Sequence, residues 1–339
     1  MAVPSLRNRL AAASLHLVEA AGEVFPFSKA IRDQQDTLNF ARAVQGYQLS
    51  MAIGAAHELG VFGFLSEPRL SSEVALHCKM SEPAARVLLN ALEACGLVSG
   101  AGARFELTAT GRRHFLKKKW TYGRGATELL LGAWNHWREL SKALQLPDGH
   151  PVLRVYNPTN PLMSEYVRLT TAMLAGPSQE LARKLDLSGV RRMICGTVGI
   201  SFAAAMLRKN PRIELVVSCL PRLIQELPAA LEQFGVKAPS EIIENSGDAD
   251  EDKWGKSESY DLIFLARKFA YCGPQHGISY LEKSRRVLPS GGRVILWEPF
   301  ADNYDPAPWM GATIALTDSM LGEPRPLYRK EEVAAFARQ

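Results

Sequence analysis

The stretch that decides the fold is VRRMICGTVGISFAAAMLRKNP, residues 190–211. It begins with apolar residues that suit a buried strand, continues through a glycine-bearing turn, and ends in an amphipathic helix. Such units hold nucleotide-type cofactors, because bare backbone at the glycines and the N-terminus of the helix can meet the ligand. Two glycines, Gly196 and Gly199, stand in this turn, whereas such turns usually carry three.

The same alternation continues through the C-terminal half. Apolar stretches that suit strands lie at residues 191–195, 213–219, 240–246, 260–266 and 293–299, with helical stretches between most of them. Strands separated by helices indicate βαβ units, a parallel sheet and right-handed crossovers. Ligands of such sheets bind beyond the carboxyl ends of the strands. The residues just after each strand are therefore the candidates for a site.

The N-terminal half has another pattern. Between about residues 38 and 143 the apolar spacing is helical. Within it, residues 71–115 predict a short helix, a second helix that ends at Gly96, and two short strands, which is the order of a winged helix-turn-helix. The second helix offers only Arg86 and Asn90 to read bases, so we expect it to pack or dimerise rather than bind nucleic acid.

Length and composition predict two domains. The chain has 339 residues, of which 47% are hydrophobic, enough for two cores. A stretch rich in Pro and Asn at residues 143–165 marks the connection. We expect a helical winged-helix domain over residues 1–150 and an α/β domain over residues 151–339. The net charge is +5, but the basic residues are scattered, so no nucleic-acid partner is expected.

The spacing of the cysteines and the N-terminal sequence indicate the cellular compartment. The five cysteines form no CxxC pair and no His/Cys cluster at metal-ligand spacing, so we expect no disulfide framework, no metal site, and a reducing cytoplasm. An apolar stretch at residues 10–22 is interrupted by His16 and Glu19 and is too short to span a membrane. We interpret it as an amphipathic helix, with an organelle-targeting peptide as the alternative.

The order of these parts resembles a known family. A helical, winged-helix part followed by GVRRMIC…AAAMLRKNP, VVSCLP, YDLIFLAR and RRVLPSGGRVILWEP is similar to the class I S-adenosylmethionine (SAM)-dependent small-molecule methyltransferases. Within them it resembles the winged-helix group of hydroxyindole, plant phenylpropanoid and polyketide O-methyltransferases and the bacteriochlorophyll methyltransferase. The resemblance covers roughly residues 38–338, and LPSGGRVILWEP is its most specific part. It implies a Rossmann-like doubly wound domain that binds SAM and an N-terminal domain that forms a homodimer.

The resemblance also implies which positions meet the cofactor. These are Gly196, Thr197, Gly199, Cys219, Leu220, Asp248, Ala266 and Arg267. Three residues in and around these positions depart from the family pattern. Cys195 stands where an acid precedes the glycine loop, and Cys219 replaces the acid whose carboxylate accepts two hydrogen bonds from the ribose. The branched Val198 should crowd a ligand that lies against the turn, and Asp248 also fits a solvated acidic loop.

The position of the catalytic base is altered too. The O-methylating members of the family carry a His after the fourth strand, which takes the proton of the acceptor hydroxyl. Ala270 occupies that position here and cannot take a proton. The catalytic candidates are Tyr271, which could orient a substrate, and His276, which is either a displaced base or a plain loop histidine.

Substrate contacts in this group come from the helix before the glycine loop and from the segment after the fifth strand. Met, Thr and aromatic side chains there would suit a flat apolar ligand, or they belong to the core. The candidates are Tyr166, Thr170, Met173, Trp309, Met310, Thr313, Thr317 and Met320. The final stretch YRKEEVAAFARQ looks like the helix before the family's last two antiparallel strands, so those strands are expected to be missing.

Two functions stay open on these residues. The first is a SAM-dependent methyltransferase that acts on oxygen or carbon of a small aromatic or polycyclic substrate, mainly by positioning the reactants. The second is a methyltransferase-fold protein that has lost methyl transfer and serves as a ligand-binding, non-methylating catalytic or scaffolding homodimer. The altered glycine turn and the residues Cys195, Cys219 and Ala270 favour the second.

Overall fold

A computed structural model describes most of the chain. The described residues are 27–101, 103–116, 122–147, 150, 152–154, 157, 159–246, 253–305 and 308–338. The apolar stretch at residues 10–22 lies outside them. Among the helices that are described, none combines the length and the apolarity that a membrane span requires.

The N-terminal part consists of helices on a small antiparallel sheet. Its elements are α2 (Phe27–Glu58), α3 (Val61–Phe64), β1 (Arg69–Leu70), α4 (Ser71–His77), α5 (Glu82–Ala94), β2 (Val98–Ala101) and β3 (Arg104–Leu107), with the sheet order β1-β3-β2. The Ser81 hydroxyl accepts a hydrogen bond from the backbone N–H of Ala84 and so caps α5. The chain leaves α5 through Gly96, whose φ of +69° suits glycine. The expected order of two helices and two strands is therefore present.

Two helices connect this part to the larger sheet. After α6 (Ala109–Gly111) and the single π-helical turn η1 (Arg112–Leu116) come α7 (Tyr122–Trp137), α8 (Leu140–Gln145) and α9 (Met163–Lys184). Helix α7 approaches α9 closely, because a Cβ on Gly125 would lie 2.9 Å from the Cα of Leu169. Ala133 of α7 belongs to the same buried cluster as Tyr166 of α9. Helix α7 thus shares the core of the second half, and the domain boundary at residue 150 stays a prediction.

The second half is built on a parallel sheet, as expected from the alternating pattern. Its strands are β4 (Arg192–Gly196), β5 (Glu214–Cys219), β6 (Glu241–Glu244), β7 (Leu262–Ala266) and β8 (Arg293–Trp297), in the order β6-β5-β4-β7-β8. All neighbouring pairs are parallel. The order reverses between β4 and β7, which is the point where open sheets of this kind bind ligands.

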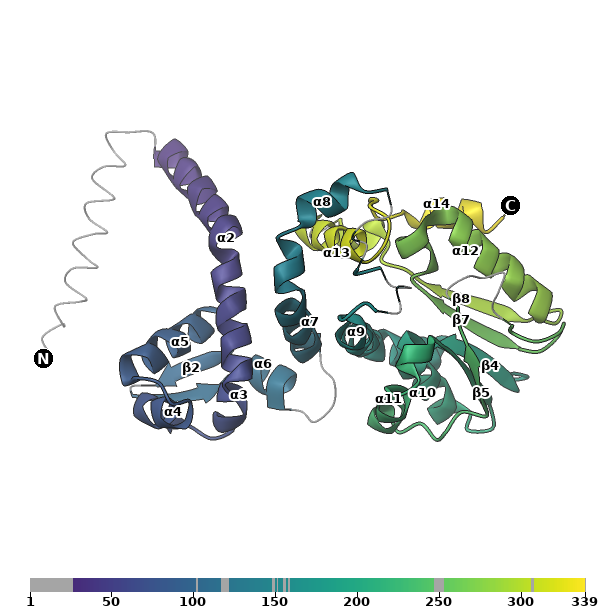
Figure 1. Cartoon of the computed structure of the whole chain (residues 1–339), viewed down its shortest axis with the longest axis horizontal. Helices are drawn as coiled ribbons and strands as arrows, with labels where there is room; N and C mark the ends of the chain where they lie inside the picture. The colour runs from purple at the N-terminus through teal and green to yellow at the C-terminus, as the bar shows by residue number, and fades with distance from the viewer. Residues whose placement is uncertain are drawn as a thin grey trace, which may run out of the picture.

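Helices cover both faces of this sheet (Figure 1). They are α10 (Ile200–Lys209), α11 (Leu227–Phe234) and α12 (Lys268–Val287), followed after β8 by α13 (Pro308–Leu321) and α14 (Lys330–Phe336). Because strand side chains alternate, Met193 packs with α9, α10 and α11, whereas Ile194 packs on the opposite face with Tyr280 of α12. Helix α12 is kinked at Gly273, whose φ is +80°. The doubly wound Rossmann-like fold class is confirmed.

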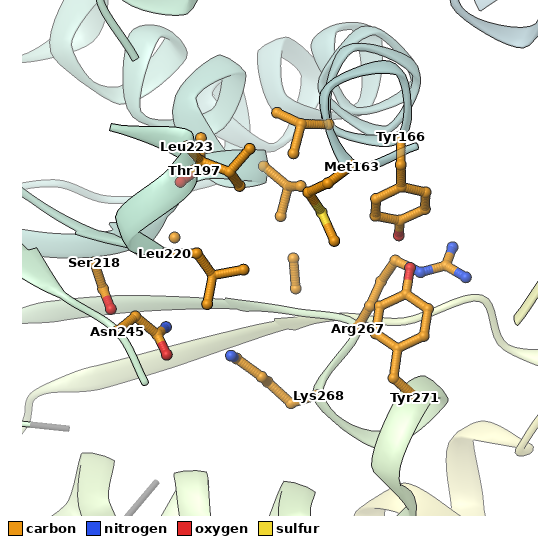
Figure 2. Close-up of a pocket in the computed structure, with 14 residues that line it drawn as sticks. Met163, Tyr166, Thr197, Ser218, Leu220, Leu223, Asn245, Arg267, Lys268 and Tyr271 are labelled. Carbon is orange, nitrogen blue, oxygen red and sulfur yellow. The ribbon is translucent and has the colours of Figure 1, made fainter. Parts of the chain in front are cut away.

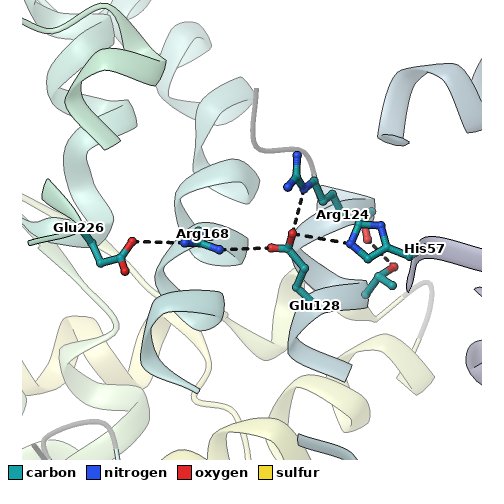
Figure 3. A network of polar contacts seen from close by, with 7 residues as sticks. His57, Arg124, Glu128, Arg168 and Glu226 are labelled. Atoms are coloured by element: carbon teal, nitrogen blue, oxygen red, sulfur yellow. Dashed lines mark hydrogen bonds and ion pairs between the residues drawn. The ribbon is translucent and has the colours of Figure 1, made fainter. Parts of the chain in front are cut away.

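A chain of polar contacts crosses from α2 to the helices that cover the sheet (Figure 3). Glu128 on α7 lies at its centre and is largely buried. Its carboxylate lies 3.8 Å from Nε2 of His57 on α2, 2.8 Å from Nε of Arg124, and 3.8 Å from Nη1 of Arg168 on α9. Arg168 in turn lies 3.3 Å from Glu226, next to α11. Shared charges of this kind hold four elements in one arrangement.

Candidate functional site

A hollow lies at the carboxyl end of the sheet, beside the point where the strand order reverses. It contains about 540 Å³ of space between atoms, part of it open to solvent. Figure 2 shows the residues that line it: Met163, Tyr166, Val167, Gly196, Thr197, Val198, Ser218, Leu220, Leu223, Asn245, Ala266, Arg267, Lys268 and Tyr271. A second hollow of about 370 Å³ continues from it and shares the linings at Gly196, Val198, Ser218, Asn245, Ala266 and Lys268. The mostly apolar wall with few polar groups is typical of a small-molecule site.

The two glycines of the turn serve different purposes. Gly196 ends β4, and a Cβ there would meet only the backbone oxygen of Ser218 at 3.8 Å, so the backbone faces open space. At Gly199 a Cβ would lie 2.8 Å from the Phe264 ring and 2.9 Å from the Cβ of Cys195, so this glycine allows α10 to pack on the strands. A short 3-10 turn, Thr197–Gly199, leads directly into α10. The Val198 side chain lines both hollows, where the sequence predicted crowding.

The cysteines of β4 and β5 are both buried in the core, although Cys195 also lines the second hollow. Cys219 is fully buried, accepts a hydrogen bond from the Thr197 hydroxyl (3.2 Å), and donates to the backbone oxygen of Leu220. Burial raises the pKa of the Cys219 thiol, which the hydrogen bond from Thr197 partly opposes. Burial also raises the pKa of Cys195 to about 12. Both thiols are therefore neutral core groups, and Cys219 does not line either hollow as the sequence predicted for a cofactor contact.

Polar groups that the sequence reasoning missed stand at this edge instead. Ser218 precedes Cys219 and points to the other face of β5, because strand side chains alternate. Its hydroxyl is buried and has no hydrogen-bond partner among the described residues. Asn245 follows β6 and lines both hollows beside Ser218. Sequence alternation from the apolar Val217 outward could have identified Ser218 as the outward-facing residue.

Arg267 occupies the start of α12 at the end of β7. Its backbone is left-handed, with φ +58° and ψ +34°, and its N–H donates to the backbone oxygen of Trp297 at 2.8 Å. The guanidinium is buried and forms an ion pair with Asp318 of α13. Aromatic rings surround it, with its Cζ 4.9 Å from the ring centre of Tyr271 and 6.0 Å from that of Tyr166. The unusual backbone and the buried charge mark this residue as part of a built site.

Tyr166 and Tyr271 meet at the inner end of the hollow. They come from α9 and α12, their ring centres lie 5.8 Å apart, and their planes are inclined at 77°. Figure 2 shows the two hydroxyls projecting toward one another. Both side chains are buried, and neither hydroxyl forms a hydrogen bond of ordinary geometry within the part of the chain that is described. Burial raises the pKa of Tyr166, although Arg267 and the nearby Thr170 hydroxyl oppose that shift.

Glu298, after β8, holds the turn that carries these groups. Its two carboxylate oxygens accept hydrogen bonds from the backbone N–H groups of Phe269 (3.1 Å) and Ala270 (3.2 Å). Burial raises the pKa of Glu298 to about 7, against the opposing effect of these hydrogen bonds and of Arg267. Glu298 also lines a smaller hollow of about 260 Å³ behind Ala270. The carboxyl group therefore sits behind the position where the sequence lacks its expected base.

The structure brings together only part of the predicted set. The hollow contains Gly196, Thr197, Leu220, Ala266, Arg267, Tyr166 and Tyr271. Residues of the predicted set that do not line it are Gly199, Cys219, His276, Thr170, Met173, Trp309, Met310, Thr313, Thr317 and Met320. Asp248 lies outside the described residues. The lining residues that sequence reasoning missed include Met163, Val167, Leu223 and Lys268.

The predicted site residues that do not line the hollow are directed elsewhere by the helices that carry them. His276 lies on α12 with its ring centre 5.0 Å from that of Tyr280, away from the hollow. Thr170 is buried one turn beyond Tyr166 on α9. Trp309 is 70% exposed and Met310 is 39% exposed on the outer surface of α13, whereas Met320 is buried in the core. The spacing of α13 therefore does not direct its large side chains into the hollow.

Comparisons with known proteins were made by sequence and by structure. No family model matches the chain. L-tyrosine C(3)-methyltransferase from Streptomyces lavendulae is 26% identical over 136 residues, which are 40% of this chain and 36% of that protein. Demethylspheroidene O-methyltransferase from Cereibacter sphaeroides is 30% identical over 145 residues, which are 42% of this chain and 37% of that protein. The matched stretches thus span little more than a third of these relatives.

Solved structures match a much larger share of the chain. An O-methyltransferase family protein from Burkholderia thailandensis has a TM-score of 0.72 at 20% identity, covering 89% of this chain and 91% of that one. Human N-acetylserotonin methyltransferase, solved in complex with SAM, has a TM-score of 0.69 at 17% identity, covering 90% and 91%. Mitomycin 7-O-methyltransferase has a TM-score of 0.69 at 17% identity, covering 91% and 92%. At these identities the likeness establishes the fold.

Proposed function

We propose that this chain, which has the fold of the class I SAM-dependent small-molecule methyltransferases, binds SAM and transfers its methyl group to a small aromatic or polycyclic acceptor. The observation that carries the proposal is the bare backbone at Gly196, which faces a hollow at the reversal point of the sheet. Its relatives are methyltransferases by name, for L-tyrosine and for demethylspheroidene. They support this function over a non-methylating scaffold.

The residues present fit the cofactor in an altered form. The Gly196 backbone and the N-terminus of α10 would meet the methionine part, where backbone N–H groups favour a carboxylate. Ser218, whose buried hydroxyl lacks a partner among the described residues, and Asn245 would meet the sugar. Bound SAM would supply the methyl group as an electrophile. Because neutral groups replace a carboxylate, we expect affinity about one or two orders of magnitude weaker than with an acid.

The acceptor would occupy the apolar inner end of the hollow. Met163, Val167 and Leu223 provide apolar contacts there, and Tyr166 and Tyr271 provide the polar ones. A flat, mostly apolar molecule with at least one polar oxygen suits this wall. The roles of Tyr271 in orienting the acceptor and of Arg267 and Ala266 beside the cofactor belong to the same proposal.

A pair of glycine variants tests cofactor binding. Gly196→Val should weaken SAM at least tenfold, because the added side chain enters the hollow, while the fold should persist because the φ of −78° and the space at the Cβ accept valine. Gly63→Val, at an open position on α3, is the matched control and should bind as the wild type does. Calorimetric titration with SAM and with S-adenosylhomocysteine measures both. Absence of heat with either nucleoside at millimolar concentration in the wild type would remove the proposed function.

We also propose a homodimer formed through α2. Phe40, Val44 and Tyr47 are 70%, 55% and 52% exposed, and their spacing of four and three residues places them on one helix face. An apolar stripe of this kind on a monomer calls for a partner, and a second copy of the same face satisfies a two-fold interface. The N-terminal dimerisation part implied by the sequence supports this choice.

Charged substitutions in the stripe should separate the subunits. The double variant Phe40→Asp, Val44→Asp should weaken the dimer at least tenfold, because it places like charges opposite each other across the two-fold axis. Leu76→Asp, at an 83% exposed position on α4, is the matched control and should leave the dimer intact. Sedimentation velocity ultracentrifugation measures the association. A monomeric wild type at tens of micromolar protein would contradict the proposal.

A cytoplasmic location belongs to the proposal as well. Cys78, Cys95, Cys195 and Cys219 are free thiols, which suits a reducing compartment. Fractionation of the source cells tests this location, and recovery of the protein from an oxidising compartment would count against it.

A further inference from the structure

Three buried groups at the inner end of the hollow have unused hydrogen-bonding capacity. They are Nε of Arg267 and the hydroxyls of Tyr166 and Tyr271, none of which makes a hydrogen bond of ordinary geometry in the described part of the chain. The three side chains are 6%, 4% and 4% exposed, so water does not satisfy them freely. A buried polar group without a partner costs free energy. Three such groups at one corner of a ligand-sized hollow indicate a ligand atom that satisfies them together.

All three groups can donate a hydrogen bond at that corner. A guanidinium Nε–H only donates, and a neutral phenol donates readily. Tyr166 reaches the corner from α9 and Tyr271 from α12, with Arg267 at the base of α12 beside them (Figure 2). A corner with several donors, in a hollow whose lining includes no carboxylate, selects an oxygen that carries negative charge.

We propose that Arg267, Tyr166 and Tyr271 bind an ionised oxygen of the methyl acceptor, a phenolate or an enolate, and that this replaces the missing general base at Ala270. The inference rests on the proposed methyltransferase function and names the class of its substrate. The donors select acceptors whose hydroxyl is acidic enough to lose its proton on binding. Tyr166 and Arg267 thereby become residues that determine specificity.

The charged groups around the corner are compatible with an anion. Arg267 and Lys268 line the hollow and favour it. Asp318 opposes it: one carboxylate oxygen is paired with Arg267, and the other has no partner among the described residues, but Asp318 lines the smaller hollow and not this one. Glu298 approaches from β8, and its oxygens are taken by the backbone N–H groups at the start of α12. Burial raises the pKa of Glu298 to about 7, so its negative charge is reduced below neutral pH.

The chemical step then needs no proton acceptor from the chain. The hydroxyl proton of the acceptor passes to solvent on binding. A lone pair on the ionised oxygen, or on a carbon conjugated with it, forms the bond to the methyl carbon, and the electron pair of the broken carbon–sulfur bond stays on sulfur. After attack by carbon, that carbon also loses its proton to solvent. The donors of the chain hold the charged oxygen until the new bond to the methyl carbon forms, which fixes the orientation of the reacting atom.

Binding of a coloured phenol without cofactor tests the inference. The probe is 7-hydroxycoumarin, whose absorption distinguishes phenol from phenolate, and coumarin, which lacks the hydroxyl, is the matched control ligand. In the wild type the pKa of the bound probe should fall by about one unit, the shift that one favourable interaction with the charged form produces. Binding of 7-hydroxycoumarin should therefore tighten between pH 6 and pH 8, while coumarin should not respond to pH.

Tyrosine variants identify the groups responsible. Tyr166→Phe and Tyr271→Phe should each weaken 7-hydroxycoumarin about tenfold at pH 8 and leave coumarin unchanged. Tyr260→Phe, just before β7 in the buried cluster on the other face of the sheet, is the control variant and should change neither. Because both inner hydroxyls lack partners in the free protein, their removal should not lower the melting temperature. This result would separate a ligand-binding role from a structural one.

Three results would overturn the inference. Binding of 7-hydroxycoumarin as the neutral phenol, equal loss of both ligands in the variants, or no binding of either ligand at millimolar concentration would overturn the inference. The calorimetric titration with SAM is independent of these results. If SAM binds but the pKa of the bound probe does not shift, the methyltransferase proposal stands and the anion site is removed. If the pKa of the probe shifts but SAM does not bind, the anion site stands and the methyltransferase proposal is removed.

Discussion

Asp318→Ala should lower the free energy of unfolding by about 3–5 kcal/mol, the cost of leaving one charge of a buried pair without its partner. The Arg267 and Asp318 side chains are only 6% and 3% exposed, so water cannot replace the lost contact. The aromatic rings around Arg267 stabilise the cation, but they do not accept its hydrogen bonds. In the variant, therefore, the Arg267 guanidinium either stays buried without a counter-ion or becomes exposed to water as the surrounding residues move apart.

Urea unfolding followed by circular dichroism measures this loss. Glu180→Ala removes a partner from an exposed ion pair with Lys184 on α9 and is the control, since it should change stability very little. The double variant Arg267→Met, Asp318→Leu should recover a large part of the loss, because apolar groups of similar size avoid the cost of burying charge. If Asp318→Ala behaves like the control, the ion pair contributes nothing and the account of this corner is wrong.

The same pair has a structural consequence for the site. Asp318 belongs to α13 and Arg267 to the turn between β7 and α12, so the pair ties the segment after the last strand to the switch region of the sheet. Met320 and Leu321 of α13 join the core that includes Tyr166 and Tyr271. Weakening the pair should thus loosen the corner that presents both tyrosines. We expect Asp318→Ala to lose acceptor binding before it loses the fold.

The sequence predicted the sheet well because its signals are local. Each buried strand is a short apolar run, and the five predicted runs coincide with β4 to β8. The turn at Gly196 and Gly199 was identified for the same reason. Val198 lines both hollows, and the crowding expected from it stays a prediction.

The site was predicted less well because it depends on the direction in which each side chain points and on contacts between residues far apart in the sequence. The family resemblance places the ribose contact at Cys219, yet the alternation of β5 directs Cys219 into the core and Ser218 to the other face. Arg267 and Asp318 are 51 positions apart, and no periodicity connects them. On α13 the apolar residues surround the helix, so spacing alone could not tell the exposed Trp309 from the buried Met320.

Glu298 should make the protein less stable as the pH rises from about 4.5 to about 7. Two effects compete at this carboxyl group. The backbone N–H groups of Phe269 and Ala270 and the charge of Arg267 favour the ionised form, whereas burial favours the neutral one. Burial wins, which raises the pKa from the ordinary 4.5 to about 7. Between these values the folded chain holds a proton that the unfolded chain has released, so stability decreases with pH.

The expected loss over this window is about 3 kcal/mol, at about 1.36 kcal/mol for each pH unit. Glu298→Gln cannot titrate, so the difference in unfolding free energy between the wild type and this variant isolates the effect. That difference should be largest at about pH 4 and below, shrink steadily to about pH 7, and stay constant above pH 8. Urea unfolding at each pH measures it. A difference that grows with pH would mean that the ionised carboxylate is the stable form, because its two backbone hydrogen bonds at the start of α12 outweigh the cost of burial.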